Sequence, residues 1–301
     1  MKNVEGLSVY QVDVFTSERF MGNPAGVVPY ADELTDHQMQ NIARELNNSE
    51  TVFILKPDND DHDLRLRFFT PNTEVPSCGH ATVAAHFVRA KELGLTSGRI
   101  LQKTGAGILP IDIDRQNNEI RVIMTQGKPL FSPALSDKFI ARIEDALGIE
   151  GKDRNLQLPV RVVSTGHSKV MIALNSKNRL NSLQPDLTAL KNLSKEIGSN
   201  GYFVFSLSGP EDDCLVHGRM FAPAIGIDED PVTGNANGPV GAYLVAEGAT
   251  DIDNGTFRFR AKQGEAMGRP GEMDVFVDIK DSQPQCVRIS GSAVNVFKAT
   301  L

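Results

Sequence analysis

Apolar and polar residues follow two different periods along the chain, and these periods predict which segments are helical and which are extended. Between Met39 and Leu46 the apolar residues recur at intervals of three and four, which is typical of one buried helix face. Thr35 and Gln38 form a capping-box pattern before this stretch, and Asn47 follows it as a helix-ending residue. A helix is therefore predicted here, followed directly by an apolar strand at residues 51–55.

The same succession of predicted elements occurs twice. In each half, a helix and turn lead into a strand, a β-rich run stops at a proline, a glycine turn opens an apolar helix, and an alternating strand closes the series. The matched segments are residues 42–55 and 193–205, 66–71 and 218–223, 78–93 and 233–245, and 104–114 and 263–278. Because the order is kept throughout, we interpret the chain as an internal duplication.

The duplication predicts two similar α+β domains, each with several strands and a mostly buried helix. Turn residues cluster at Gln126–Pro129 and at Ser132-Pro133, which places the joint there. We therefore expect one domain at residues 1–127 and a second at 128–301, and we allow the final strand to pack on the first domain.

Composition and charge narrow the function classes. The chain has 301 residues, 40% of them hydrophobic, and a formal net charge of -7 without any long basic cluster. Nucleic acid and anionic lipid are therefore not expected as partners. The sequence has no apolar run long enough to span a membrane and no signal-like start, so we expect a cytoplasmic protein. Its three cysteines form no CxxC pair, which predicts neither a disulfide framework nor a metal site.

The two halves differ at the turn before the first matched strand. Glu50 stands there in the first half, and Gly201 stands at the corresponding place in the second. A carboxylate beside a buried apolar strand is suited to general acid or base chemistry. The alternative is an ordinary solvated glutamate at the mouth of a strand.

The two glycine turns form a second group of candidates. Gly79-His80 and Gly234-Asn235 each stand where a helix is expected to begin, so free backbone N–H groups could bind an anion, and two such ends facing each other would clamp a carboxylate. Alternatively, glycine only permits a tight turn. Neither turn has the glycine spacing of a dinucleotide or phosphate-loop motif, so no cofactor is predicted. Asp230, where the first half has Val75, is a further difference between the halves.

Cys78 occupies the position that Thr233 has in the second half. A racemase with two thiol bases needs cysteine at both places, and a threonine hydroxyl cannot replace a thiolate. Cys78 is therefore either one base of a racemase or a small apolar residue.

The histidines of this region do not suggest a metal site. His80 and His86 are six residues apart, which separates them by about 120° on a helix and disfavours a shared metal ion.

Four separated motifs resemble those of a known family. They are FMGNPAGV at 20–27, NSET at 48–51, CGHAT at 78–82 and EDPVTGNA at 229–236. On these motifs, the chain from about Val9 to Phe297 resembles the PhzF family of phenazine-biosynthesis-like isomerases. The resemblance implies a diaminopimelate-epimerase-like fold, in which two similar domains each wrap a curved, barrel-like β-sheet around a central helix. It also implies an active site in the cleft between the domains, and a homodimer.

The resemblance further implies roles for individual residues. In this family the glutamate of the NSET-like motif shuttles a proton, which assigns the catalytic roles to Glu50, His80 and Asp230. The glycine-containing helix ends would hold a substrate carboxylate; the implied binding residues are Asn23, Gly79, His80, Gly166, His167, Gly234 and Asn235. Where the phenazine enzyme has serine after the second glycine, this chain has Asn235, so the resemblance does not identify the substrate.

These observations predict a cofactor-independent isomerase that moves a proton on a small carboxylate-bearing substrate, with Glu50 as acid and base. Two alternatives stay open at this point. One is a racemase or epimerase that depends on Cys78, and the other is a non-catalytic protein that binds small carboxylates.

Overall fold

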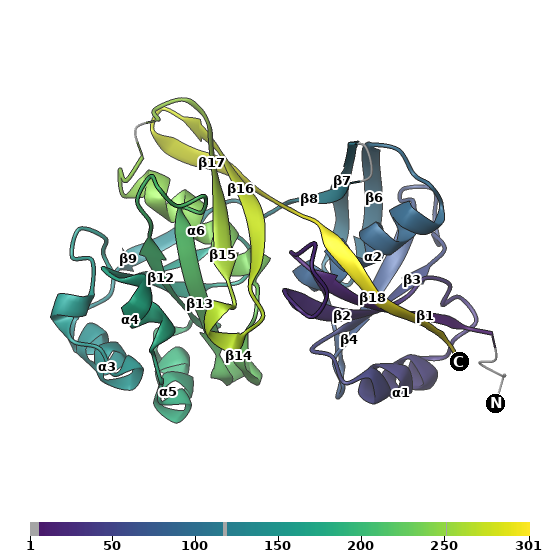
Figure 1. Ribbon diagram of the computed structural model, residues 1–301, viewed down its shortest axis with the longest axis horizontal. Helices are drawn as coiled ribbons and strands as arrows, with labels where there is room; N and C mark the ends of the chain where they lie inside the picture. Colours follow the sequence, from purple (N-terminus) through teal and green to yellow (C-terminus); the bar gives the residue numbers. More distant parts are fainter. Residues whose placement is uncertain (1–5, 117–118, 251) are drawn as a thin grey trace. The chain divides into compact units, whose positions relative to one another are not determined.

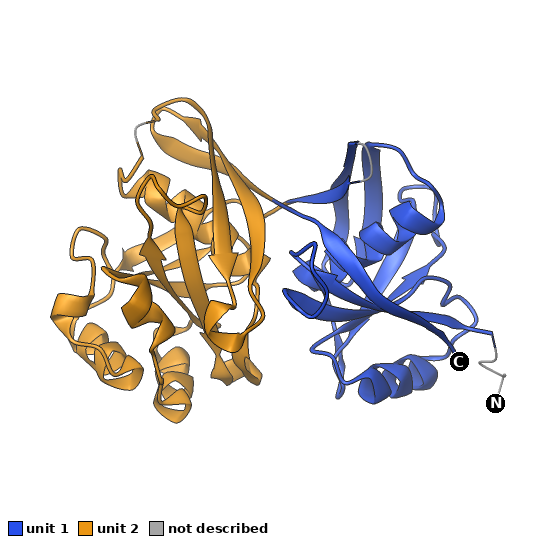
Figure 2. Ribbon diagram, viewed as in Figure 1, with its two compact units in different colours: residues 1–124, 290–301 blue, residues 125–289 orange. Residues whose placement is uncertain are grey.

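The computed structural model describes residues 6–116, 119–250 and 252–301 (Figure 1). The chain forms two compact units, coloured separately in Figure 2: unit 1 contains the residues up to Met124 together with Ser290–Leu301, and unit 2 is Thr125–Ile289. The chain thus passes from one unit to the other three residues before the boundary expected after residue 127. Its C-terminal segment belongs to unit 1, where the last strand pairs with the first.

Unit 1 is a curved sheet with two helices. Its strands are β1 (Ser8–Val14), β2 (Asn23–Val28), β3 (Thr51–Leu55), β4 (Leu64–Phe69), β5 (Glu74–Val75), β6 (Gly98–Thr104), β7 (Gly107–Gln116), β8 (Glu119–Thr125) and β18 (Ala293–Thr300), and its helices are α1 (Asp36–Leu46) and α2 (Gly79–Glu92). The strands follow the order β18-β1-β2-β3-β4-β6-β7-β8, and the short β5 also pairs with β4. The pairs β2/β3 and β4/β6 are parallel.

The two helices of unit 1 have different surroundings. Helix α1 has the predicted capping box of Thr35 and Gln38 and ends at Asn47 in a left-handed conformation. It is amphipathic, and its buried face packs against the sheet in a cluster that includes Phe53 and Phe69. Helix α2 is buried from His80 through Val88 and packs against β1, β2 and β3, so it is the central helix of this unit (Figure 1).

Unit 2 repeats this plan with additional helices. Its strands are β9 (Leu130–Ala134), β10 (Arg161–Ser164), β11 (Lys169–Leu174), β12 (Tyr202–Leu207), β13 (Val216–Ala222), β14 (Ile227–Asp230), β15 (Gly255–Gln263), β16 (Gly271–Lys280) and β17 (Gln283–Gly291); its α-helices are α3 (Asp137–Leu147), α4 (Lys177–Asn181), α5 (Leu187–Ile197) and α6 (Gly234–Ala246); and its 3-10 helices are η1 (Gly151–Asp153), η2 (Pro223–Ile225) and η3 (Glu265–Met267). Helix α6 is buried from Ala236 to Val245 and is the central helix. Helices α3 and α5 cover the opposite face of the sheet in a second core.

The strand pairings of the two units correspond one to one. The order β9-β10-β11-β12-β13-β15-β16-β17, with β14 on β13, matches the order found in unit 1, and the pairs β11/β12 and β13/β15 are again parallel. The chain changes unit before the last strand of each half: β9 follows β8 of unit 1 in sequence but pairs with β10 of unit 2, and β18 follows β17 of unit 2 but pairs with β1 of unit 1. The fold class predicted from the sequence, two similar epimerase-like α+β units with a central helix each, is confirmed.

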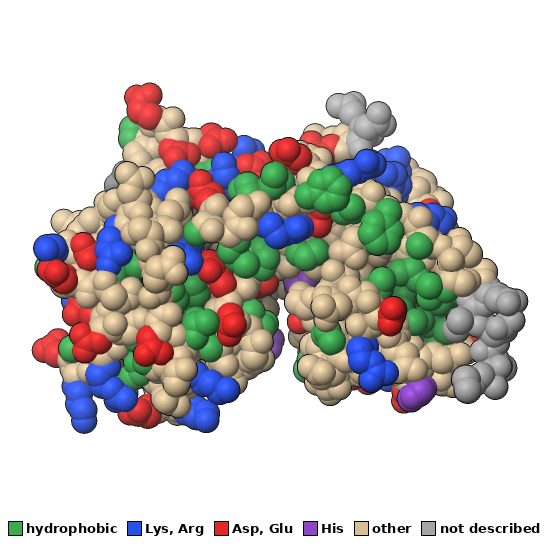
Figure 3. All heavy atoms as spheres, turned by 60° about the horizontal axis from the view of Figure 1, so that its bottom comes forward, with side chains coloured by type: hydrophobic (Ala, Val, Ile, Leu, Met, Phe, Trp, Pro, Cys, Tyr) green, Lys and Arg blue, Asp and Glu red, His purple; other side chains and the backbone are tan. Residues whose placement is uncertain are grey.

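The surface agrees with the absence of a basic stripe in the sequence. On the face of unit 2 seen in Figure 3, acidic and basic side chains are interspersed rather than gathered by sign. Among the residues that the structure describes, no helix is both long enough and apolar enough to cross a membrane.

Candidate active site

Glu50 lies between helix α1 and strand β3, and its backbone holds it against strand β2. Its carbonyl oxygen accepts a hydrogen bond of 3.2 Å from the Gly26 amide. The side chain is only 14% exposed, and its Oε2 lies 3.5 Å from Nε2 of His80. The structure thus brings together two of the three residues predicted to be catalytic.

His80, in the first turn of helix α2, is the centre of a small polar cluster in unit 1. Its Nε2 also lies 3.4 Å from Oγ of Ser49, and its Nδ1 lies 3.4 Å from Sγ of Cys78. The imidazole is 8% exposed, so packing holds the ring between these neighbours. A histidine in contact with a carboxylate can orient it and exchange a proton with it, so this pair is suited to acid/base catalysis.

The start of helix α2 is free of a side-chain cap. Cys78 is the N-cap residue but makes no capping hydrogen bond, and the first backbone N–H groups of a helix have no partner within the helix. A Cβ atom at Gly79 would meet no atom within 4 Å, and its φ is not in the left-handed region. Neither backbone conformation nor crowding therefore requires glycine here, and its absent side chain leaves the amide accessible to an anion.

Asn23 is the first residue of strand β2, three residues before Gly26, and is 1% exposed. The chain enters this strand through a strained turn, because Phe20 has φ 71° and its amide is held by the Asp13 carboxylate at 2.6 Å. Glycine is required at position 22, where φ is 64° and a Cβ would stand 2.2 Å from the Val14 carbonyl oxygen. Because β2 and β3 are parallel, with Gly26 beside Thr51, Asn23 and Glu50 lie at the same end of the sheet.

In unit 2, Asp230 is the last residue of strand β14 and is 8% exposed. Its carboxylate accepts a hydrogen bond from the Thr233 hydroxyl. The side chain of Gln263 holds this turn through three hydrogen bonds. Its amide nitrogen donates a bond of 2.7 Å to the Asp230 carbonyl oxygen. Its oxygen accepts one bond of 3.1 Å from the Thr233 amide and another of 2.8 Å from Asn237 Nδ2. Sequence reasoning missed Gln263, which was visible only as a polar residue at the end of an alternating strand.

Helix α6 begins at Gly234, as predicted, but the reason for glycine differs from that at Gly79. A Cβ at Gly234 would stand 2.4 Å from Cδ1 of Ile289, so an added side chain would require Ile289 to shift. Gln126 fixes the turn: Nε2 donates to the Gly234 carbonyl at 2.9 Å, and Oε1 accepts from the Thr165 hydroxyl at 2.7 Å. Asn235 departs from helical geometry with ψ 15°, and its Oδ1 lies 3.5 Å from Gln126 Nε2.

The predicted binding residues Gly166 and His167 form the turn between β10 and β11. Gly166 has φ 139°, a conformation that favours glycine. His167 Nδ1 lies 3.4 Å from Nδ2 of Asn200. Although the residue reaches the surface, the surrounding protein removes part of the hydration of its ring, and this, with a smaller effect from the Lys169 charge, lowers the pKa of His167. Thr165, the residue before this turn, donates to Gln126, which in turn holds the start of helix α6.

One arrangement in unit 1 has the residue types of a metal site. Ligand atoms of Glu50, Cys78 and His80 all lie within 4.8 Å of one another. However, the cysteine approaches Nδ1 of the ring and the glutamate approaches Nε2, so a single ion at either nitrogen would lie away from the partner of the other. The geometry fits a hydrogen-bonded cluster better than metal coordination.

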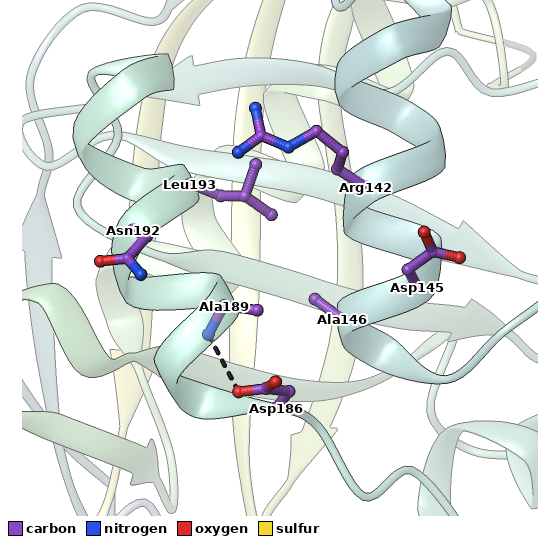
Figure 4. Close-up of a pocket in the computed structure, with 7 residues that line it drawn as sticks. All are labelled: Arg142, Asp145, Ala146, Asp186, Ala189, Asn192 and Leu193. Carbon is purple, nitrogen blue, oxygen red and sulfur yellow. Dashed lines mark hydrogen bonds between the residues drawn. The ribbon is translucent and has the colours of Figure 1, made fainter.

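A pocket of unit 2 lies apart from all predicted site residues. It is lined by helices α3 and α5 and includes Arg142, Asp186 and Leu193 (Figure 4). Both terminal nitrogens of the Arg142 guanidinium bind Glu196, and Asp186 caps helix α5 through the Ala189 amide. These polar groups already have structural partners, and we assign the pocket no function.

Comparisons with known proteins agree with the fold and show the family. The family model for "Phenazine biosynthesis-like protein" matches residues 12–299. An uncharacterized isomerase of Clostridium acetobutylicum is 53% identical over 98% of this chain and 97% of its own length, and the uncharacterized isomerase YddE of Escherichia coli is 50% identical over 97% of each. The trans-2,3-dihydro-3-hydroxyanthranilate isomerase of Pseudomonas fluorescens is 32% identical over 96% of this chain and 97% of its own.

Solved structures give the same result. The phenazine biosynthesis protein of the PhzF family from Bacillus anthracis has a TM-score of 0.88 at 32% identity and covers 98% of each chain. A probable proline racemase from Agrobacterium radiobacter K84 has a TM-score of 0.61 at 13% identity, covering 98% of this chain and 92% of its own, which shows a shared fold alone.

Proposed function

Because the chain belongs to the phenazine biosynthesis-like (PhzF) family and is of the isomerase class, we propose that it moves a proton on a small carboxylate-bearing substrate, without a cofactor, using Glu50 as acid and base. The observation that carries this proposal is the contact between Glu50 Oε2 and His80 Nε2 at 3.5 Å in a nearly buried cluster. The matching position of unit 2 is Gly201, which has no side chain to offer.

The proposed reaction needs one base. The Glu50 carboxylate takes a proton from a carbon near the substrate carboxylate, and the electron pair of the broken C–H bond shifts into an adjacent double bond. The glutamic acid, whose proton exchanges with solvent, then returns a proton to another carbon, so the product is an isomer and no oxidant or reductant is consumed. Acid/base catalysis of this kind contributes roughly 10²- to 10⁴-fold in rate.

The other predicted residues have supporting roles in this proposal. His80 orients the Glu50 carboxylate, and the helix starts at Gly79 and Gly234 donate backbone N–H groups to the substrate carboxylate. Asp230 orients a polar group of the substrate. The N-cap residues of the two helices, Cys78 and Thr233, make no side-chain capping hydrogen bond. This supports the role of the helix starts as hydrogen-bond donors.

The experiment that tests the proposal is a thermal-shift screen of small cyclic and unsaturated carboxylic acids, followed by NMR in deuterium oxide. The panel includes trans-2,3-dihydro-3-hydroxyanthranilate because a relative is named for its isomerisation. We expect at least one acid to stabilise the protein and to exchange hydrogen for deuterium at carbon. Glu50→Gln should stop the exchange, and Glu45→Gln, a change at an exposed position of helix α1, should not.

Retention of deuterium incorporation in Glu50→Gln would refute the proposed role of this residue. Stabilisation by a carboxylic acid without exchange in the unmodified protein would instead favour a protein that only binds small carboxylates.

One observation favours a second candidate function. Cys78 Sγ lies 3.4 Å from His80 Nδ1, and a cysteine beside a histidine can be activated as a thiolate base, as a racemase requires. The position of Thr233 in unit 2 argues against a matching second thiol. Unchanged turnover in Cys78→Ser would eliminate this candidate.

The proposal includes two expectations about the working form of the protein. We expect a homodimer, which light scattering at micromolar concentration would detect, and a cytoplasmic location, which cell fractionation would test. A monomer in light scattering would contradict the first.

A further inference from the structure

The two units can be aligned residue by residue at the strands beside Glu50. In unit 1 the Gly26 amide donates to the Glu50 carbonyl at 3.2 Å, and in unit 2 the Val170 amide donates to the Gly201 carbonyl at 2.9 Å. Because these two bonds are equivalent, the residues that precede the donors are equivalent as well. Ala25 in unit 1 therefore corresponds to Lys169 in unit 2.

The difference at this position concerns charge. Unit 1 presents a carboxylate at Glu50 and a methyl group at Ala25, while unit 2 presents no side chain at Gly201 and an ammonium group at Lys169. In addition, the carboxylate of Asp230 stands where the sequence repeat places Val75. Each unit thus carries charged groups at positions where its counterpart is small or apolar.

Lys169 points toward the side of the sheet that holds the central helix. Its neighbour Val170 belongs to the core under helices α3 and α5, and side chains alternate along a strand, so Lys169 lies on the other face. The parallel register between β11 and β12 places Phe203 and Phe205 on this same face. The ring centroids of Phe205 and of Tyr243, in helix α6, are 6.2 Å apart. Lys169 is at the strand end next to the Gly166-His167 turn.

The ammonium group is buried with few partners. Lys169 is 3% exposed, and the hydrogen bond that the structure shows for Nζ goes to the carbonyl of its neighbour Ser168 at 3.3 Å. Among the described residues, no carboxylate lies within ion-pair distance of Nζ. Burial lowers the pKa of Lys169 to about 8, and the Asp230 charge partly opposes this effect. An ammonium group has three donors, and leaving them without acceptors in a buried position costs free energy.

We propose that Lys169 is a further substrate-binding residue, whose ammonium group binds a carboxylate oxygen of the substrate beside the start of helix α6. This inference rests on the proposed function, since it supplies the cation for the carboxylate that Glu50 acts next to. The helix start offers only partial charge, whereas Lys169 offers a full charge in a poorly hydrated place, where a charge-assisted hydrogen bond is strongest.

A purely structural role for Lys169 would be to offset the Asp230 charge. The two roles differ in what they predict for ligands. A structural lysine would change the stability of the protein and leave carboxylate affinity and its pH dependence unaltered. A lysine that binds the ligand must be protonated to hold an anion. The affinity for carboxylates therefore falls once the pH rises above the pKa that Lys169 has in the protein without ligand. The other titratable groups that act on Lys169 are His167, in the turn before β11, and Asp230, at the end of β14.

The test measures the binding of benzoate to the full chain by calorimetry or NMR between pH 6 and pH 10, with the neutral analogue benzamide as a control ligand. Lys169→Met removes the charge at nearly constant volume, Lys169→Arg keeps it, and Lys191→Met is the matched control at an exposed lysine of helix α5. Cyclohexene carboxylate and 2-aminobenzoate are measured in the same way.

We expect Lys169→Met to weaken carboxylate binding roughly 10- to 100-fold and to leave benzamide unaffected. In the unmodified protein, affinity should fall above pH 8 by about tenfold per pH unit, and in Lys169→Arg it should stay flat because arginine keeps its charge. If Lys169→Met does not fold, the pH profiles of carboxylate affinity in the unmodified protein and in Lys169→Arg decide whether Lys169 binds the ligand. Equal affinity of Lys169→Met and the unmodified protein, or equal pH profiles in the unmodified protein and Lys169→Arg, would overturn the inference.

Failure of this inference can be distinguished from failure of the proposed function. If carboxylates bind in a Lys169-dependent way but Glu50→Gln still exchanges deuterium, only the role of Glu50 is wrong. If Glu50 is required for exchange but Lys169→Met binds normally, only the role of Lys169 is wrong. If none of the acids bind to the unmodified protein, both proposals fall.

Discussion

Unit 1 and unit 2 are built from the same order of strands around a buried helix, yet the glycines at their matching turns have different physical causes. Gly79 has open space where a Cβ would stand, whereas Gly234 has Ile289 Cδ1 at 2.4 Å. At the preceding matched turn, unit 1 carries Glu50 and unit 2 carries Gly201, where a Cβ would stand 2.6 Å from the Phe221 carbonyl oxygen. The two units thus share one scaffold, and Glu50 and Gly79 differ from their counterparts at positions proposed to meet the substrate.

The largest expected effect is on deuterium exchange, and it distinguishes the carboxylate of Glu50 from that of Asp230. Glu50→Gln in unit 1 should lower deuterium exchange by roughly 10²- to 10⁴-fold while ligand binding is retained, because only the proton acceptor is lost. Asp230→Asn in unit 2 should lower exchange by about tenfold and weaken binding, since the charge that faces Lys169 is removed. The measurement is exchange by NMR beside calorimetric binding. If both variants lost exchange and binding equally, the division of roles between the units would be wrong.

The next effect concerns stability at the turn before the matched strand. Gly201→Ala should destabilise the protein by about 1–3 kcal/mol, because the new methyl group would be forced against backbone atoms that cannot move freely. Glu50→Ala, at the equivalent position in unit 1, should change the free energy of unfolding by less than about 1 kcal/mol. Urea unfolding monitored by circular dichroism measures both. Similar values for the two variants would contradict the difference in crowding.

The helix starts provide a third comparison. Gly234→Ala should cost about 1 kcal/mol, because the buried Ile289 side chain must shift to make room for the methyl group. Gly79→Ala should be neutral or stabilising by up to about 1 kcal/mol, since alanine is favoured in helices and nothing is crowded. The same Gly79→Ala change should nevertheless weaken carboxylate binding, because the methyl group would stand over the free amides. Unaltered carboxylate affinity in Gly79→Ala would show that this helix start does not bind the ligand.

The smallest expected effect is a pH dependence that belongs to unit 2. The buried His217 lies 2.6 Å from Glu265 and 3.0 Å from Asp212, and Lys177 lies 3.0 Å from Glu265. Burial raises the pKa of Glu265, but the hydrogen bonds and charges of His217 and Lys177 together outweigh it and lower this pKa to about 2. The Cys214 amide, with His217, lowers the pKa of Asp212 to about 2. A carboxyl group whose pKa is lowered by folding stabilises the protein above its unfolded pKa of about 4.

This stabilisation should disappear as the pH falls from about 4 toward 2. Glu265→Gln should therefore flatten the dependence of the urea midpoint on pH in that range and leave it unaltered near pH 7 apart from a constant offset. At the position that the repeat places opposite His217, unit 1 has Arg65, which does not titrate in this range. An unchanged slope in Glu265→Gln would refute the assignment.

Local patterns predicted the elements well, because they depend on residues close in sequence. The capping box of Thr35, the end of helix α1 at Asn47 and the helix starts at Gly79 and Gly234 all agree with the structure. The duplication was visible for the same reason, since each half repeats the same short-range patterns. The contact of Glu50 with His80 was expected only through the resemblance of their motifs to those of a family.

The sequence by itself determined the repeated order of elements, the burial of the two central helices and the residue types that can carry acid/base chemistry. Only the tertiary structure decided that Gln126 and Gln263 hold the turns of unit 2, that strand β18 completes unit 1, and that Lys169 is buried opposite Gly201. These facts depend on partners far away along the chain, such as Thr233 for Gln263, 30 residues apart, and Asn295 for Val12, 283 residues apart. Side-chain periodicity records which face of an element is buried, but not which distant polar group meets it there.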